Sequence, residues 1–328
     1  MKTNNRYVKY FIIVLVVIFL IAAAFLALDL WESGRGKYQG PATDDSVISH
    51  DGKEFVPNEN IETLLVLGLD KYHGADGAAS HEDGVQSDFL MLFVFDNSKE
   101  QCTAIQINRD TMTRIKKLSI GGTAVVGTYT AQIALAYNYV ADDNAKIKCR
   151  NTCDSVEYLM NGIKVDHYLS LTMDCVSALN DLVGGVEVTV LDDFTGIDDA
   201  LVKGETVTLT GERALRYVRS RYGLDDSTNS SRMERQQQYI NALYDKTVSC
   251  MGSNESFAVE LADTLDDYVV YDSSNERMMK FIEKLDKYEF LGIRDLEGES
   301  RLGEEFVEFY PDESSLRELV LDLFYKQK

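Results

Sequence analysis

An uninterrupted apolar run near the start of the chain constrains its topology more than any other feature. Residues 11–28, FIIVLVVIFLIAAAFLAL, are all apolar, and a helix needs about 20 such residues to cross a bilayer core. Lys2, Arg6 and Lys9 come before the run, which predicts a cytoplasmic N-terminus and an exported remainder. We therefore expect one transmembrane helix over residues 11–30. A cleaved signal peptide is the alternative, and it also exports the main domain.

The balance of charge narrows the classes of partner. The chain has 54 Asp and Glu against 33 Lys and Arg, a formal charge of −21, whereas a general nucleic-acid binder shows a broad basic surface. The apolar content of 45% is ordinary for a globular protein and argues against disorder. The sequence therefore predicts an exported globular domain that does not bind nucleic acid.

The pattern of apolar residues predicts alternating strands and helices after a polar stalk. Residues 31–60 lack periodicity and are predicted to be this stalk. Apolar runs bounded by turn residues predict strands, and helical spacing predicts helices. Strands are expected at 61–70, 89–96, 102–107, 166–171 and 184–191, and helices at 129–143, 152–162, 172–182, 209–218, 232–248, 276–287 and 314–326. This alternation favours an α/β sandwich around a central mixed sheet, preceded by the transmembrane helix.

Six arginines lie close together in an acidic chain and indicate a site for a compact anion. No lysine occurs between Lys203 and Lys246, so the local preference is for guanidinium, which suits bidentate contact with phosphate or carboxylate oxygens. If residues 217–221 are extended, the side chains of Arg219 and Arg221 point to the same face. On the helix that follows, Arg232 shares a face with Gln236. We assign an anion site to Arg219, Arg221 and Arg232, and ion pairs with nearby carboxylates to Arg213 and Arg216.

Polar residues at the ends of the predicted strands offer a second set of candidates. Asp70 follows the first strand, Asp88 precedes the second, and Arg109 and Asp110 follow the third, and strand ends are where α/β proteins place their sites. Two carboxylates together with phosphate oxygens can hold Mg²⁺. Turn or cap roles for both aspartates are the alternative.

The cysteine content does not predict a disulfide framework. The chain has five cysteines, too few for such a framework in a domain of this size. Cys149 and Cys153 are close enough in sequence to pair in an oxidising compartment, and five free thiols are the alternative. The sequence leaves this open.

An ordered series of short motifs resembles the LytR–CpsA–Psr family of membrane-anchored cell-wall proteins. The motifs are LLVLGLD, SDFLML, NRDT, DHYLSL, LVGGVEV, LTGERALRYVRSR and RMERQQ, and they cover about residues 61–245. The resemblance implies an α/β/α sandwich with a catalytic domain over residues 61–250 and a helical continuation of that domain over 251–328. It also implies a protein of the cell membrane of a Gram-positive bacterium, with residues 1–10 in the cytoplasm.

The resemblance also implies an activity. It is the transfer of an anionic glycopolymer, of teichoic acid or capsular polysaccharide type, from a polyprenyl-pyrophosphate carrier to peptidoglycan. By position, Asp70 and Asp88 match residues associated with Mg²⁺. The residues that match those holding the pyrophosphate are Arg109, Arg219, Arg221, Arg232 and Gln236, with Arg235 in the same motif as either a further contact or a structural residue. Asp110 would orient Arg109 beside the reacting phosphate.

Three positions depart from the family pattern and keep other functions open. Gln86 stands where the family usually has Arg, Asn108 where Pro is common, and Gln132 where Lys is often found. Two positive contacts are therefore expected to be absent. The alternatives are a non-catalytic binder or scaffold for lipid-linked glycans, and a hydrolase of polyprenyl pyrophosphate.

Overall fold

The computed structural model describes residues 47–70, 85–141, 144–220, 223–224, 229–254, 257–265, 268–272, 284, 287–304 and 306–328. The predicted transmembrane helix at 11–30 lies outside these ranges. Within them, no helix combines the length and apolar character needed to cross a bilayer.

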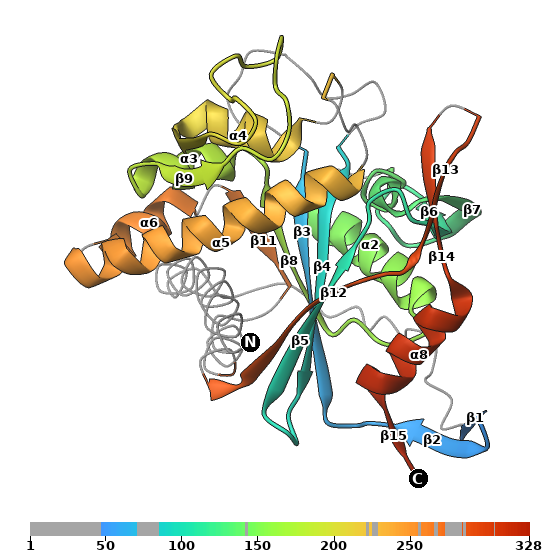
Figure 1. The fold of residues 1–328 in the computed structure, drawn as a ribbon. Coiled ribbons are helices and arrows are strands. Elements are labelled where there is room, and N and C mark those ends of the chain that lie inside the picture. The colour runs from blue at the N-terminus through green and yellow to red at the C-terminus, as the bar shows by residue number, and fades with distance from the viewer. Residues whose placement is uncertain are drawn as a thin grey trace.

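A six-stranded mixed sheet forms the centre of the molecule (Figure 1). Neighbouring strands are antiparallel except for the pairs β8–β3 and β5–β12, which are parallel. Across the sheet the strands are β11 (Val269–Tyr271), β8 (His167–Thr172), β3 (Ile61–Leu69), β4 (Ser87–Asp96), β5 (Gln101–Ile107) and β12 (Glu289–Asp295). The three continuous apolar runs of the sequence are β3, β4 and β5, and they are buried because helices cover both faces of the sheet.

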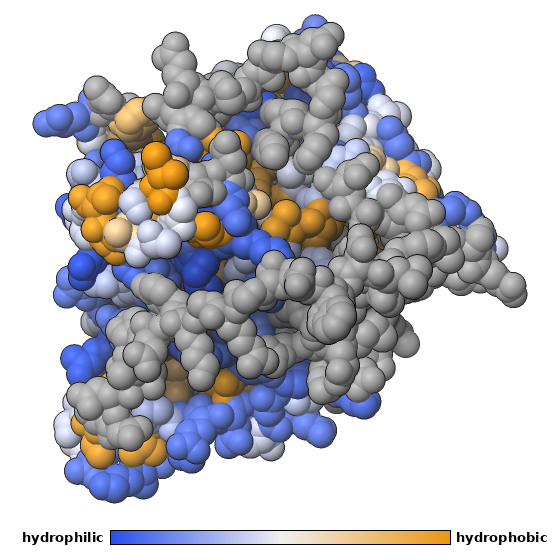
Figure 2. Space-filling view, turned by 180° about the vertical axis from the view of Figure 1, so that it is seen from behind, coloured by the Kyte–Doolittle hydropathy of each residue, from blue (hydrophilic) through white to orange (hydrophobic). Residues whose placement is uncertain are grey.

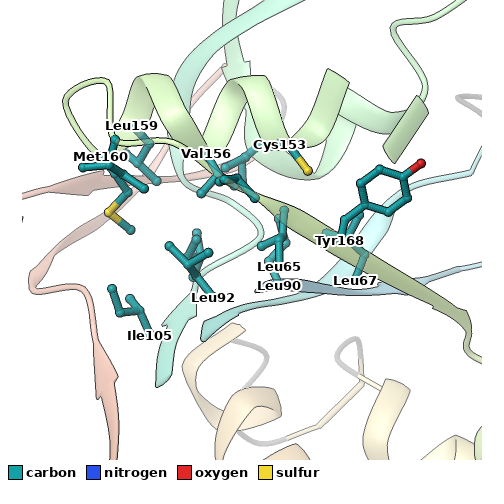
Figure 3. Packing of buried hydrophobic residues seen from close by; sticks show 14 of the residues in the cluster. Leu65, Leu67, Leu90, Leu92, Ile105, Cys153, Val156, Leu159, Met160 and Tyr168 are labelled. Carbon is teal, nitrogen blue, oxygen red and sulfur yellow. The ribbon is translucent and has the colours of Figure 1, made fainter. Parts of the chain in front are cut away.

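One face of the sheet is covered by α2 (Ala145–Leu159), α8 (Glu313–Phe324) and the 3-10 helix η2 (Ile133–Tyr137). Figure 3 shows side chains of α2, such as Val156, pointing toward Leu65 and Leu92 of the sheet. Asp312 caps α8, because its side chain accepts a hydrogen bond from the Ser315 amide at 2.8 Å.

The opposite face is covered by helices that carry part of the site. Ile240 of α5 packs against both the sheet and a second core cluster. This cluster joins α5 (Asn229–Ser253) to α3 (Cys175–Leu182), α4 (Gly211–Arg219), α6 (Phe257–Leu265) and the hairpin of β9 (Val186–Thr189) and β10 (Thr206–Leu209). The result is three layers, helices–sheet–helices, as predicted.

Besides the β9–β10 hairpin, three smaller sheets of the described residues lie outside the central one. They are the hairpin of β6 (Met112–Leu118) and β7 (Val125–Gln132), the hairpin of β13 (Gly298–Leu302) and β14 (Val307–Pro311), and a three-stranded sheet of β1 (Ile48–His50), β2 (Lys53–Pro57) and β15 (Tyr325–Gln327).

The structure corrects three sequence predictions. Residues 129–143 are not one helix, because the segment up to Gln132 pairs with β6 and only the next five residues form a short 3-10 helix. The C-terminal part is not only helical, because β12 pairs in parallel with β5 and a hairpin follows it. The predicted stalk is structured from residue 48, because β2 pairs with β1 and with β15.

The two neighbouring cysteines of α2 are free thiols in the structure. Cys149 and Cys153 are both buried against the sheet. Burial raises the pKa of Cys149 to about 12, and it also raises the pKa of Cys153. The thiolate is the reactive form, so this pair acts as part of the apolar core.

Candidate functional site

The ends of three central strands meet at one edge of the sheet and bring the predicted strand-end residues together. Asp70 follows the last residue of β3, Asp88 lies at the start of β4, and Arg109 lies two residues beyond β5. Because β4 is antiparallel to both neighbours, all three positions fall on the same edge. The amide of Asp70 donates to the carbonyl of Gln86 at 2.9 Å, which links the first two strand ends directly.

Asp88 is held between two arginines that come from different elements. The Nη1 of Arg109 donates to its Oδ1, and the Nη1 of Arg232, from α5, lies 3.2 Å from its Oδ2. Arg109 also donates to the side-chain oxygen of Gln86. Charged groups buried in this way must be paired, and Asp88 and Arg232 are both buried.

Arg219 brings a third guanidinium to this edge. It is the last residue of α4, and its Nη2 lies 3.0 Å from the carboxylate of Asp70. A cation at the end of a helix is favoured by the helix dipole. The backbone leaves the helix at Ser220. The helix predicted to residue 218 is therefore present, and the extended conformation considered for residues 217–221 does not begin before Ser220. Arg221 lies outside the described residues.

A pair of asparagines joins the strand end to the helix that carries Arg232. The Oδ1 of Asn108 accepts from the amide of Asp110 at 2.9 Å and from the Nδ2 of Asn229 at 2.8 Å. Asn229 in turn accepts from Arg232 through its side-chain oxygen. Sequence reasoning missed Asn229, although an Asn opening a long predicted helix is a signal for a polar cap.

Asp110 pairs with Arg109 and is itself held by Gln132. Its Oδ1 lies 3.5 Å from the Nε of Arg109 and accepts from the Nε2 of Gln132 at 3.1 Å. The same nitrogen of Gln132 donates to the carbonyl of Val307 at 2.7 Å. Gln132 is therefore a bridge between the site and β14.

Arg235 is placed differently from the three arginines above, and its contacts favour the structural alternative of its prediction. Its side chain is fully buried and donates to the carbonyls of Tyr217 and Ser220 and to Asp192. The guanidinium also lies 5.5 Å from the ring of Phe194. All of its nitrogens thus contact the protein, so we assign Arg235 to packing.

Gln236 also contacts the protein backbone. Its Nε2 donates to the carbonyl of Val218 at 3.3 Å, directly before Arg219. The side chain is buried, so in this structure it helps to position the end of α4.

The remaining two arginines of the sequence cluster form ion pairs, as predicted. Arg213 and Arg216 lie 2.9 and 2.7 Å from the carboxylate of Asp198. Burial acts to raise the pKa of Asp198, but hydrogen bonds from both arginines and from the Ala200 amide outweigh it and lower the pKa. These two side chains are partly exposed and lie outside the candidate site.

The donor set of the site is compatible with Mg²⁺ carried by a phosphate ligand. Asp70 and Asp88 supply hard oxygen ligands, and the buried Ser87 Oγ beside them has no hydrogen-bond partner among the described residues. No group of three or more His, Cys, Asp or Glu side chains in the described part of the chain could form a complete metal cage. Mg²⁺ needs only one or two carboxylates when phosphate oxygens complete its shell, so the residues fit this mode of binding.

The charged side chains that the structure describes at the edge of the sheet are paired with one another. Among the described residues, three arginines face three carboxylates, and each of these guanidinium groups lies within 4 Å of a carboxylate oxygen. A ligand anion would share or take over these guanidinium contacts. The charged residues are Arg109, Arg219 and Arg232 with Asp70, Asp88 and Asp110.

Comparison with known proteins gives a consistent family and fold. The model of the LytR_cpsA_psr family matches residues 33–319. "Biofilm regulatory protein A" of Streptococcus mutans is 28% identical over 251 residues, which is 74% of this chain and 58% of that protein. A protein of Enterococcus faecalis named polyisoprenyl-teichoic acid–peptidoglycan teichoic acid transferase TagU is 28% identical over 72% of this chain and 69% of its own length.

A solved structure described as "TagT bound to LI-WTA" shares the fold. It has a TM-score of 0.56 at 20% identity and covers 87% of this chain and 98% of the solved one. The likeness confirms the α/β architecture with a central mixed sheet. The chain spans less than two thirds of the length of several curated relatives, including the Streptococcus mutans protein.

Proposed function

The chain belongs to the LytR–CpsA–Psr family, and from that premise we propose that it is a phosphotransferase acting on the cell wall. It transfers an anionic glycopolymer from a polyprenyl-pyrophosphate carrier to peptidoglycan. The observation that carries the proposal is the meeting of Arg109, Arg219 and Arg232, from three separate elements, at one edge of the sheet. A pyrophosphate is the compact, highly charged group that such a set of guanidinium groups recognises.

The reaction in this proposal is one exchange of bonds at phosphorus. A hydroxyl of the acceptor sugar attacks the phosphorus that carries the glycan and forms a new P–O bond. The bond from that phosphorus to the bridging oxygen breaks, polyprenyl phosphate leaves, and the hydroxyl proton is released. Little covalent chemistry is asked of the protein, so positioning and neutralisation of charge provide the catalysis.

Each residue of the site has a part in this proposal. Arg109 and Arg232 converge on the position of Asp88, and Arg219 on that of Asp70, so phosphate oxygens near these carboxylates meet all three cations. Asp110 and Gln132 fix the direction of Arg109. Mg²⁺ bound at Asp70 and Asp88 would supply further positive charge to the pyrophosphate oxygens. We place Arg221 in the same set by its motif alone.

The location of the enzyme is part of the proposal. Residues 11–30 anchor the chain as a single-pass helix, with the N-terminus in the cytoplasm and the catalytic domain outside. This arrangement keeps the domain at the membrane surface, where the lipid carrier presents its pyrophosphate.

The test is a transfer reaction with the full-length protein in detergent. A lipid-pyrophosphate-linked sugar, peptidoglycan oligomers and Mg²⁺ are supplied, and the products are identified by mass spectrometry. We expect glycan joined to peptidoglycan through phosphate, with loss of product for Arg109→Ala, for Asp88→Ala and on removal of Mg²⁺. Arg216→Ala is the matched control, because that arginine pairs with Asp198 outside the site.

The other outcomes separate the alternatives. Phosphorylated sugar free in solution would indicate a hydrolase. Donor binding without turnover of several donors would indicate a binding protein. Gln86 would explain the second outcome, because it stands where the family usually has another arginine and itself accepts a hydrogen bond from Arg109.

A further inference from the structure

A large groove lies between elements that the proposed reaction does not use, and two of its walls are connected to the strand end of Arg109. Its volume is about 1390 Å³, and its walls come from β6, β7, α2, β14 and the start of α8. Met112, three residues after Arg109, is part of the lining. The Phe309 amide of β14 donates to the carbonyl of Asp110 at 2.9 Å, so the β14 wall is fixed to the strand end that carries the site.

Three tyrosines from three different elements expose their rings in this groove. Tyr129 of β7, Tyr158 of α2 and Tyr310 of β14 all line it, and their residues are 47%, 55% and 38% exposed. Tyrosine offers a large rigid ring with a polar tip. The apolar C–H faces of a sugar ring pack on such rings, while the sugar hydroxyls need polar neighbours.

Each ring is supported by a neighbouring side chain. The guanidinium of Arg114 lies 5.3 Å from the ring centroid of Tyr158, and that of Arg301 lies 5.3 Å from the ring centroid of Tyr310. Tyr129 makes an edge contact with the ring of Tyr139 at a centroid distance of 5.7 Å. These contacts hold exposed rings in place before a ligand arrives, which lowers the entropy cost of binding.

The charges of the groove disfavour a polyanion. The acidic side chains of the lining equal its arginines and lysines in number, and Lys116 pairs with Asp154 at 2.8 Å. A polyanion needs an excess of positive charge, which this lining does not have. The charged lining residues other than His50 are Arg114, Lys116, Arg317, Asp154, Glu157 and Glu313.

Figure 2, which views the molecule from behind, shows hydrophilic residues with separate apolar patches on the face that it presents. The apolar side chains of β7, such as Val125 and Val126, are exposed as well. A surface of aromatic rings among polar groups of both signs suits an extended carbohydrate.

We propose that this groove binds the acceptor glycan strand, an uncharged or weakly charged β-1,4-linked N-acetylated polysaccharide. That the glycan is the acceptor rests on the proposed function. That the groove binds a glycan is argued from its lining residues alone. The strand lies across Tyr129, Tyr158 and Tyr310, and one of its hydroxyls reaches the pyrophosphate at Arg109.

The test measures glycan binding apart from transfer. The full-length protein in detergent micelles is titrated by calorimetry with a β-1,4-linked N-acetylglucosamine tetramer. Tyr158→Ala and Tyr310→Ala are each expected to raise the Kd about fivefold or more, whereas Tyr158→Phe, which keeps the ring, stays within about twofold. Leu291→Ala on β12 is the matched control, because Leu291 is 54% exposed and does not line the groove.

A second titration, with a polyprenyl-pyrophosphate sugar, separates this inference from the proposed function. The groove variants are expected to bind this donor as the wild type does, and to raise the KM for the acceptor in a transfer assay. Tetramer binding that depends on the tyrosines, in a protein that transfers nothing, would retain the glycan groove and reject the transferase. Absence of tetramer binding, or equal Kd values in wild type and both Ala variants, would overturn the groove whatever the transfer assay shows.

Discussion

Arg232 and Arg235 lie one turn apart on α5 and are both buried, yet they belong to two different regions of the molecule. Arg232 contacts the side chain of Asp88 at the edge of the sheet and that of Asn229 at the start of its own helix. Arg235 donates to the backbone carbonyls of Tyr217 and Ser220 as well as to Asp192. Burial and residue type are therefore the same, and the kind of partner is what differs.

The difference teaches how to distinguish an arginine for binding from an arginine for packing. Backbone carbonyls cannot move aside for a ligand without loss of the local fold, whereas a carboxylate side chain can exchange its partner. Arg235 therefore fixes the end of α4 and so the position of Arg219. Arg232 instead presents its charge at the site. The packing region around Arg235 therefore positions the residues of the candidate site.

The largest expected effect tests the packing region. Arg235→Ala should lower the free energy of unfolding by about 3–5 kcal/mol, because it leaves Asp192 buried without its cation. Denaturant unfolding measures the loss, with Arg216→Ala as the control at about 1 kcal/mol or less. A loss as small as that of the control would contradict the assignment of Arg235 to packing.

The next effect tests the binding region. Arg232→Ala should lower kcat/KM for transfer by about 10²–10³-fold, the range for removal of one donor to a developing anion. Its effect on unfolding should be smaller than that of Arg235→Ala, because Asp88 keeps Arg109. Kinetics and unfolding are measured on the same preparation. If the activity of Arg232→Ala falls only in proportion to the folded fraction, Arg232 is a packing residue like Arg235.

A smaller effect is expected at Asn229, which links the end of β5 to the arginine of α5. Asn229→Ala removes the link between Asn108 and Arg232 and should lower kcat/KM about tenfold, since a lost hydrogen bond to a charged group is worth about 1.5–3 kcal/mol. In a double-variant cycle with Arg232→Ala the losses should not add. Additive losses would show that Asn229 acts independently of Arg232.

The smallest effect concerns the arginines outside both regions. Asp198 has a lowered pKa when folded, so its ion pairs stabilise the protein above the unfolded pKa of about 3.9 and lose this effect as the pH falls through the folded pKa. Asp198→Asn should therefore cost about 0.2–1 kcal/mol at pH 7. The cost should shrink below about pH 4, as measured by unfolding across a pH series. A cost that is constant with pH would point to packing.

The core of the fold could be predicted from sequence because β3, β4 and β5 are long apolar runs. The hairpin at residues 112–132 could not, because its pairing joins residues up to 20 positions apart, and the helical spacing of Ile133, Ala136 and Tyr137 is satisfied by a short 3-10 helix. β12 was missed because its partner β5 is almost 190 residues earlier. Its strand state is set by that contact and not by its own composition.

The site was predictable in part because strand ends and arginine spacing are visible in the sequence. Asp70, Asp88, Arg109, Arg219 and Arg232 do come together, although their roles in catalysis and metal binding stay predictions. The sequence does not show which groups each arginine contacts in the folded protein. Arg235 has the same local pattern as Arg232, and only the approach of α4 to α5 shows that its donors meet backbone carbonyls.

The pairing of β2 with β15 has a mechanical consequence. The second strand of the described chain, β2, is held by the last one, β15, and the Asn58 amide donates to the Phe324 carbonyl at 2.9 Å. Tension on the chain before residue 48 would therefore load the bonds of β1, β2 and β15 before it reached β3 and Asp70. In the proposed membrane-anchored arrangement, this small sheet would carry a pulling force from the anchor before that force reached the strand ends of the candidate site.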